Sequence, residues 1–109
     1  MSERELEVYE VEILRDVRTR VATLETWVKN GKRHREGGPS KIERDPITGA
    51  VVLEVWTRDG EFHREDGPAI ISRKADTGRI YYSQWFVNGE KIAPPRPSRP
   101  SSKASGLKP

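Results

Sequence analysis

The sequence predicts an all-β protein: an antiparallel meander of repeated β-hairpins that forms a single curved sheet or a half-barrel and ends in a disordered C-terminal tail. Three observations support this prediction. The tryptophans stand at positions 27, 56 and 85, which are 29 residues apart, and a gapless repeat in this range indicates units that pack against their neighbours. An Asn-Gly or Asp-Gly pair follows each tryptophan at a constant distance, and these pairs favour tight hairpin turns. The segments before these pairs are rich in β-branched and aromatic residues, as strands are.

The repeated hairpins define a domain that we expect to cover residues 1–93, with units at about 11–39, 40–68 and 69–93. Residues 94–109 follow as a separate tail, in which proline, serine and basic residues predominate. This composition buries too little apolar surface to offset the entropy of ordering, so the tail is expected to be disordered. Hydrophobic residues make up 33% and charged residues 34% of the chain. The core should therefore be thin, and dimerisation would help to cover it.

The first element in chain order has two candidate structures. A strand over about residues 8–15 is favoured, because Ile13 aligns at the 29-residue spacing with Ile42, which lies in an extended segment. A helix is the alternative, because helical spacing relates Leu6, Tyr9, Ile13 and Val17.

Each full unit is expected to contain two strands with a tight turn at either end. One turn ends in a Thr-Gly pair, first at Thr48-Gly49, where glycine can adopt a positive φ angle. The strand that follows, over about 50–58 or 79–87, leads to the Asn-Gly or Asp-Gly pair, which favours a type I′ turn. Beyond that turn a Gly-Pro pair interrupts the return strand. Proline cannot donate to a ladder, so this pair predicts a bulge, a corner or a sheet edge.

Strand residues alternate between the two faces of a sheet. This alternation places the tryptophans on the more charged face, as a stripe across the sheet, and places the expected core on the opposite face. The stripe has two interpretations: each indole packs against the return segment of its own unit, or the stripe is exposed and binds a partner. The expected core positions are Ala22, Leu24, Thr26, Val28, Val51, Leu53, Val55, Thr57, Ile80, Tyr82, Gln84 and Phe86.

No group of residues in the sequence indicates a reaction. The absence of cysteine excludes a disulfide, a thiolate metal site and a cysteine nucleophile. His34 and His63 are each followed by Arg-Glu, and we expect them to bond to neighbouring backbone rather than to a metal. No serine recurs beside them as a nucleophile. We therefore expect no enzymatic activity, no metal site and no cofactor.

The charged residues after each histidine have two candidate roles. We expect ion pairs between units, formed by Arg35 with Glu36, and by Arg64 with Glu65 and Asp66. The alternative is a recognition patch, in which the two arginines bind a carboxylate or a phosphate through their forked donors.

The distribution of charge bears on the partner. The net charge is +3, and residues 94–109 contain four basic residues and no acidic one, so the rest of the chain is nearly neutral. The basic tail and the aromatic residues make nucleic-acid binding the alternative function. No apolar segment is long enough to span a membrane, and the chain begins without an apolar signal segment. We therefore expect a cytoplasmic protein with no membrane partner.

The element Trp-x-x-Asn/Asp-Gly-x-x-His, followed by Arg-Glu-x-Gly-Pro, resembles two related groups of repeats. Residues 63–69 resemble the His-Arg-x-Asp-Gly-Pro-Ala repeat of bacterial, phage and large-virus proteins. The other group is the MORN repeat. The spacing of the present units is longer than in MORN repeats, and arginine follows the histidine where those repeats have glycine. The resemblance covers about residues 11–92 and implies an elongated sheet of hairpins that serves as a non-catalytic interaction scaffold. The residues that resemble the core of the MORN repeat are Trp27, Gly31, Lys32 and His34.

The function expected from the sequence is non-enzymatic protein binding. In a phage or a mobile element, such a small domain would act as an inhibitor that occludes a host protein. A homodimer is a further expectation. Tryptophan and arginine are favoured anchors in protein interfaces, which predicts a partner-binding set of Trp27, Trp56, Trp85, Arg58, Arg35, Arg64 and Tyr81.

Overall fold

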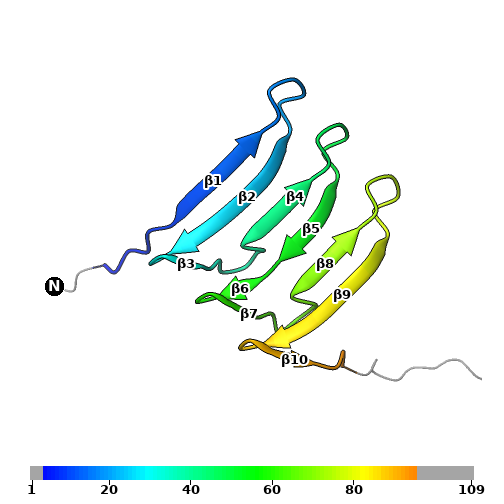
Figure 1. Cartoon of the computed structure of the whole chain (residues 1–109). Helices are drawn as coiled ribbons and strands as arrows, with labels where there is room; N and C mark the ends of the chain where they lie inside the picture. The colour runs from blue at the N-terminus through cyan, green and yellow to red at the C-terminus, as the bar shows by residue number, and fades with distance from the viewer. Residues whose placement is uncertain (1–3, 96–109) are drawn as a thin grey trace, which may run out of the picture.

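The structure, a computed structural model, describes residues 4–95 of the chain. The regular structure in this part of the chain is all β, with no helix (Figure 1). Most of the predicted tail lies outside the described residues. The strands are β1 (Glu10–Arg15), β2 (Ala22–Lys29), β3 (Lys32–Arg33), β4 (Lys41–Arg44), β5 (Val51–Val55), β6 (Thr57–Arg58), β7 (Glu61–Phe62), β8 (Ile70–Arg73), β9 (Ile80–Val87) and β10 (Glu90–Ile92).

The strands form an antiparallel meander. The main sheet has the order β1-β2-β4-β5-β8-β9-β10, β3 pairs with β2, and β6 and β7 form a small ribbon. Figure 1 shows three long hairpins, β1–β2, β4–β5 and β8–β9, lying side by side with their turns at the same end. The predicted all-β antiparallel class is confirmed, and the helical alternative for the first element is wrong because that element is β1. We call residues 11–39, 40–68 and 69–93 units 1, 2 and 3.

The Asn-Gly and Asp-Gly pairs form the tight turns that the sequence predicts. Asn30, Asp59 and Asn88 have φ angles of 52°, 52° and 50°, and the glycine after each also has a positive φ. A type I′ turn requires both positive angles. These turns send the chain back from β2, β6 and β9 into the short strands β3, β7 and β10.

The turns at the opposite end share one conformation but differ in one residue. A positive φ occurs at Gly49 (79°) and Gly78 (76°), and at the equivalent Arg20 (66°) of unit 1. The carboxylates of Asp16 and Asp45 accept hydrogen bonds from backbone N–H groups of the same turn. These bonds, chiefly those from Thr19 and Thr48, lower the pKa of both aspartates. Unit 1 therefore carries strain at Arg20 that glycine relieves in the other units.

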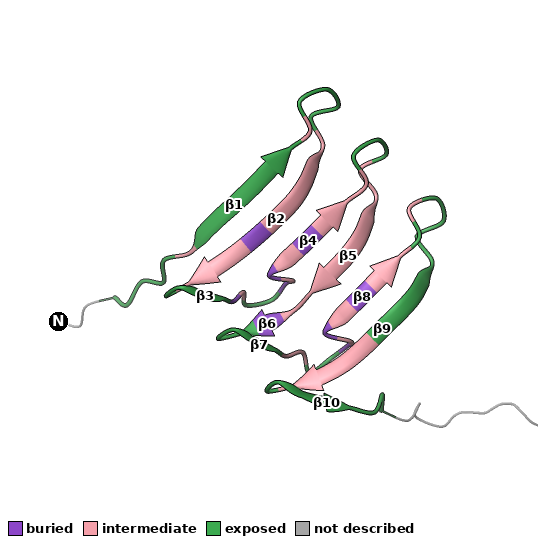
Figure 2. Ribbon diagram, viewed as in Figure 1, coloured by how far each residue is buried: buried purple, intermediate pink, exposed green. Residues whose placement is uncertain are grey.

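The buried apolar side chains lie on the face that carries the tryptophans, which we call the tryptophan face. Ile42 and Ile71 are 8% and 3% exposed, and both are cross-strand neighbours of Glu54. Cross-strand neighbours share a face, and Glu54 precedes Trp56 by two residues along the strand, which places the indole on the same face. Figure 2 shows that the buried positions are few and lie on the middle strands and the connections beside them.

The expected core on the opposite face is therefore wrong. Among its twelve positions only Thr26 and Thr57 are buried, eight are half-buried, and Ile80 and Tyr82 are exposed. The reason is that the return segments after the tight turns fold over the tryptophan face, where their arginines cover the indoles.

A one-residue bulge in each long hairpin also moves part of the expected core. In β1–β2 the extra residue is Thr23, so Ala22 pairs with Arg15 and does not share a face with Leu24. A bulge places two residues opposite one and so reverses the alternation beyond it. The same shift moves Val51 and Ile80.

Candidate functional site

An arginine lies against the tryptophan in each of the first two units. The Arg35 Cζ atom is 3.9 Å from the centroid of the Trp27 ring, and the Arg64 Cζ atom is 3.8 Å from that of Trp56. A guanidinium over an indole face is attracted by the ring quadrupole. We call each pair a clamp. The two clamps account for the half-buried state of these tryptophans.

The Gly-Pro pair completes each clamp. In unit 2 the Arg64 Nη1 atom donates to the Pro68 carbonyl oxygen at 3.2 Å. A Cβ atom on Gly67 would lie 2.7 Å from the Arg64 Cζ atom, closer than such atoms can approach. Glycine is therefore required here by the space that the arginine occupies, and proline contributes its carbonyl. The first clamp has the same arrangement, with Arg35, Pro39 and Gly38.

Each histidine connects its own unit to the tight turn of the next. The buried His34 accepts the backbone N–H of Asp59 at Nδ1, at 3.0 Å, and contacts the Glu36 carboxylate through Nε2, at 2.9 Å. His63 accepts the backbone N–H of Asn88 at Nδ1, at 2.9 Å. An Nδ1 acceptor places the ring proton on Nε2. These contacts agree with the expected backbone-bonding role, and residues 4–95 contain no cluster of three acidic or histidine side chains that could hold a metal.

The ion pairs between units are formed by residues other than those expected. We call the place where two successive units pair a joint. Arg44 Nη2 donates to Glu25 across the joint between units 1 and 2, at 3.3 Å. Arg73 Nε donates to Glu54 across the joint between units 2 and 3, also at 3.3 Å. The expected partners pair within their own units instead: Arg64 with Asp66, His34 with Glu36, and His63 with Glu65. The reason is that stacking on the indole turns each clamp arginine back toward its own unit.

The two clamps differ in how the indole N–H is used. Trp27 Nε1 donates to the Glu25 carboxylate at 2.7 Å, and this hydrogen bond is the main cause that lowers the pKa of Glu25. Trp56 Nε1 is buried and has no hydrogen-bond partner among the described residues. A buried donor without a partner is costly. The indole N–H is therefore hydrogen-bonded in unit 1 and lacks a partner among the described residues at the equivalent position of unit 2.

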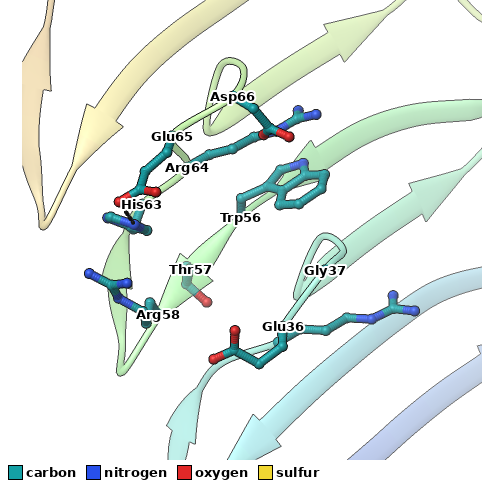
Figure 3. Close-up of a pocket in the computed structure, with 10 residues that line it drawn as sticks. Glu36, Gly37, Trp56, Thr57, Arg58, His63, Arg64, Glu65 and Asp66 are labelled. Carbon is teal, nitrogen blue, oxygen red and sulfur yellow. Dashed lines mark hydrogen bonds and ion pairs between the residues drawn. The ribbon is translucent and has the colours of Figure 1, made fainter.

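An open groove of about 320 Å³ lies where units 1 and 2 meet. Figure 3 shows Trp56 and the side chains of unit 2 on one side of it and Glu36 of unit 1 on the other. Three arginines and three carboxylates line it, so both signs of charge are available to a partner. The lining residues are Arg35, Glu36, Gly37, Trp56, Thr57, Arg58, His63, Arg64, Glu65 and Asp66.

The structure brings part of the predicted partner-binding set together in this groove: Trp56, Arg35, Arg58 and Arg64 all line it. Arg58 is exposed, and its Nη2 atom donates to the Asn88 side-chain oxygen at 2.7 Å.

The remaining predicted residues lie elsewhere. Trp27 is covered by Arg35 and by Tyr9, which makes a T-shaped contact with the indole at a centroid distance of 5.6 Å. Trp85 lines a second open pocket of about 470 Å³ in unit 3. Tyr81 is exposed on β9, with the Lys74 Nζ atom 4.8 Å from its ring centroid.

Sequence reasoning missed two features of this region. Glu36 was expected to pair with an arginine, but it contacts a histidine and lines the groove. The hydroxyls of Ser40 and Thr57 form a buried hydrogen bond of 2.6 Å within unit 2. No pattern signals this pair, because unit 3 has Phe86 at the position of Thr57.

Comparisons with protein-family models, curated proteins and solved structures find no match for this chain. The resemblance to MORN-like repeats therefore stays a prediction from the residues. The described residues contain no helix that is long and apolar enough to span a membrane.

Proposed function

We propose that this protein is a non-enzymatic binding module that holds a segment of another protein in the groove between units 1 and 2. The observation that carries the proposal is the groove lining, which combines Trp56 with three arginines and three carboxylates. Tryptophan and arginine are the residues most enriched among the energetic anchors of protein interfaces.

The groove is already organised for binding. Stacking on indoles and bonding to proline carbonyls hold Arg35 and Arg64 in place. Side chains that are fixed before binding lose less entropy when a partner arrives. Arg58 is exposed at the groove wall, so the guanidinium donors that Asn88 does not use can pair with a partner carboxylate.

The carboxylates of the groove select a partner of mixed charge. The side chains of Glu36, Glu65 and Asp66 are 66%, 75% and 85% exposed. Exposed carboxylates offer steering and specificity to lysine or arginine side chains of a partner. The segment that fits is therefore polar, with charges of both signs. Holding it would cover that part of the partner's surface, which is how we expect a small phage or mobile-element domain to inhibit a host protein.

A capture experiment with matched charge reversals tests this function. Tagged wild-type, Arg58→Glu and Arg79→Glu proteins are used to capture partners from a lysate of the native host. Arg58 lines the groove, and Arg79 is also exposed but follows the turn between β8 and β9 and does not line the groove. We expect Arg58→Glu to reduce recovery of the partner by at least about tenfold, and Arg79→Glu to leave it unchanged. Equal recovery by all three proteins would contradict the proposal.

The same experiment at two salt concentrations separates protein binding from nucleic-acid binding. Nucleic-acid affinity falls steeply as salt rises, because bound phosphates release counterions. Groove binding anchored by Trp56 should persist at the higher salt concentration. Loss of all recovery at high salt, with nucleic acid in the eluate at low salt, would favour the alternative function.

A further inference from the structure

We propose that the chain assembles head to tail, with β1 of one molecule pairing with the free edge of β9 of another. The proposal starts from the two joints inside the chain. At the first, β2 pairs with β4, with Glu25 opposite Ile42. At the second, β5 pairs with β8, with Glu54 opposite Ile71. Both partners of the second pair stand 29 residues after those of the first, so the two joints share one register.

The chain carries both halves of one more such joint. Among the described residues, β1 pairs only with β2, and the outer side of β9 pairs with β10 only over Trp85–Val87. Residues 80–84 of β9 therefore form a free edge. Figure 1 shows that β1 and β9 lie toward opposite ends of the row of strands, so they cannot pair within one molecule. An edge strand presents unpaired backbone groups to another chain.

The exposure of Ile13 shows that the β1 edge lacks a neighbouring strand. Ile13 of β1 stands where Ile42 and Ile71 stand in β4 and β8. The two interior side chains are 8% and 3% exposed, whereas Ile13 is 45% exposed. The interior strands have a neighbour on both sides and β1 has one. A β9 edge on its open side would give Ile13 the second flank that the interior residues have.

The shared register specifies the contacts of the added joint. Continuing the internal pairing sets Ser83 opposite Ile13, Tyr82 opposite Leu14, and Gln84 opposite Glu12 of the second molecule. Tyr82 and Leu14 are both exposed apolar side chains that would cover each other. A glutamine amide can donate to a glutamate carboxylate. Ser83 and Gln84 also border the open pocket of Trp85, so the added strand would form a missing wall of that pocket.

The sequence favours a second molecule over the chain's own tail as the occupant of this edge. At the 29-residue spacing, the tail has Pro100 where β4 and β8 have Ile42 and Ile71. Proline disfavours a central strand because it cannot donate to the ladder. By contrast, β1 has isoleucine and arginine, Ile13 and Arg15, at the same positions as β4 and β8.

The added joint is expected to be weaker than the internal ones. Unit 3 has Ile92 where His34 and His63 stand, so it lacks the connector that accepts an N–H from the next unit. Assembly should therefore be reversible and depend on concentration. Because the two contacting surfaces differ, successive molecules would build an open chain or a ring rather than a symmetric dimer.

Sedimentation of three variants tests the proposal. Ile13→Lys places a charge in the β1 half of the joint, Tyr82→Lys places one in the β9 half, and Val17→Lys is the matched control on an exposed turn. We expect the wild type and Val17→Lys to assemble as concentration rises. Each edge variant alone should associate at least about tenfold more weakly. A mixture of the two edge variants should form a one-to-one dimer, because each retains the half that the other lacks.

Two results would overturn the proposal. The first is a wild type that stays monomeric at every concentration, or edge variants that fail to complement each other in the mixture. The second comes from amide hydrogen exchange of the Ile13→Lys monomer, in which the N–H groups of residues 80–84 that point away from β8 should exchange rapidly. Protection of those amides in the monomer would mean that the chain covers its own edge.

Discussion

Units 1 and 2 hold their tryptophans under an arginine, whereas unit 3 has Ala93 at the position of that arginine and Ile92 at the position of the histidine. In the first two units the histidine accepts an N–H from the tight turn of the following unit. Unit 3 has no following unit in the described chain. The histidine therefore occurs where one unit is joined to the next.

The largest effect is expected when the same position of the repeat is compared in an interior strand, β8, and in the edge strand β1. Ile71→Ala should reduce the free energy of unfolding by about 2–5 kcal/mol, because it leaves a cavity in a thin core. Ile13→Ala, at the equivalent exposed position of β1, should cost less than about 1 kcal/mol. Urea unfolding of dilute protein measures both. Equal losses would show that β1 is as well packed as β8.

The next effect concerns the second clamp. Gly67→Ala should force Arg64 away from Trp56 and reduce stability by about 1–3 kcal/mol, because the stack and the bond to the Pro68 carbonyl are both lost. A double-mutant cycle with Arg64→Ala isolates this cause. If the glycine serves only to admit the arginine, then Gly67→Ala should cost little once Arg64 is absent. The same cost in both backgrounds would contradict that role.

The third effect compares the two indoles. Trp27→Phe removes a donor from the Glu25 carboxylate, whereas Trp56→Phe removes an N–H that has no partner. Both lose similar ring area, so Trp27→Phe should cost about 1–2 kcal/mol more. Thermal unfolding of the two variants checks the difference. A larger loss for Trp56→Phe would mean that its N–H is bonded in solution.

Acid should weaken the first clamp. The folded-state pKa of Glu25 lies below its ordinary value, chiefly because Trp27 donates to its carboxylate. The resulting stability is fully present above the unfolded-state pKa and is lost as pH falls through the folded-state value. Glu25→Gln should therefore flatten the stability profile below about pH 4.5, the ordinary value for this group. An unchanged acid slope in urea unfolding would contradict this assignment.

The smallest effect is a gain. Arg20 has a positive φ where units 2 and 3 have glycine, so Arg20→Gly should stabilise the protein by about 0.5–1 kcal/mol through relief of strain. Gly49→Ala makes the converse change and should destabilise it. A loss of stability on Arg20→Gly would show that the arginine side chain contributes more than the strain costs.

The sequence was sufficient to predict the turns and the class of the fold, because the signals for both are local. A pair such as Asn30-Gly31 encodes a type I′ turn with little help from its surroundings. The covered face could not be predicted in the same way. It depends on where Arg35 and Arg64 fold back after those turns, and that placement comes from stacking with distant residues.

The bulges escaped prediction for a different reason. Thr23, Val52 and Tyr81 are equivalent extra residues, one in each unit. A bulge that every unit shares leaves the 29-residue spacing unchanged. In the candidate site, the tryptophans and arginines were predictable as residue types. Only the structure shows which of them line the groove, which indole is covered and which one lines the second open pocket.

Amide hydrogen exchange of a His63→Ala variant tests the connecting role of the histidines most directly. The backbone N–H of Asn88 donates to His63, and that of Asp59 donates to His34. We predict that the variant loses protection at Asn88 while Asp59 keeps it, because only the joint between units 2 and 3 is cut. Unchanged protection at Asn88 would contradict the account, since the histidine would then not be what ties one unit to the next.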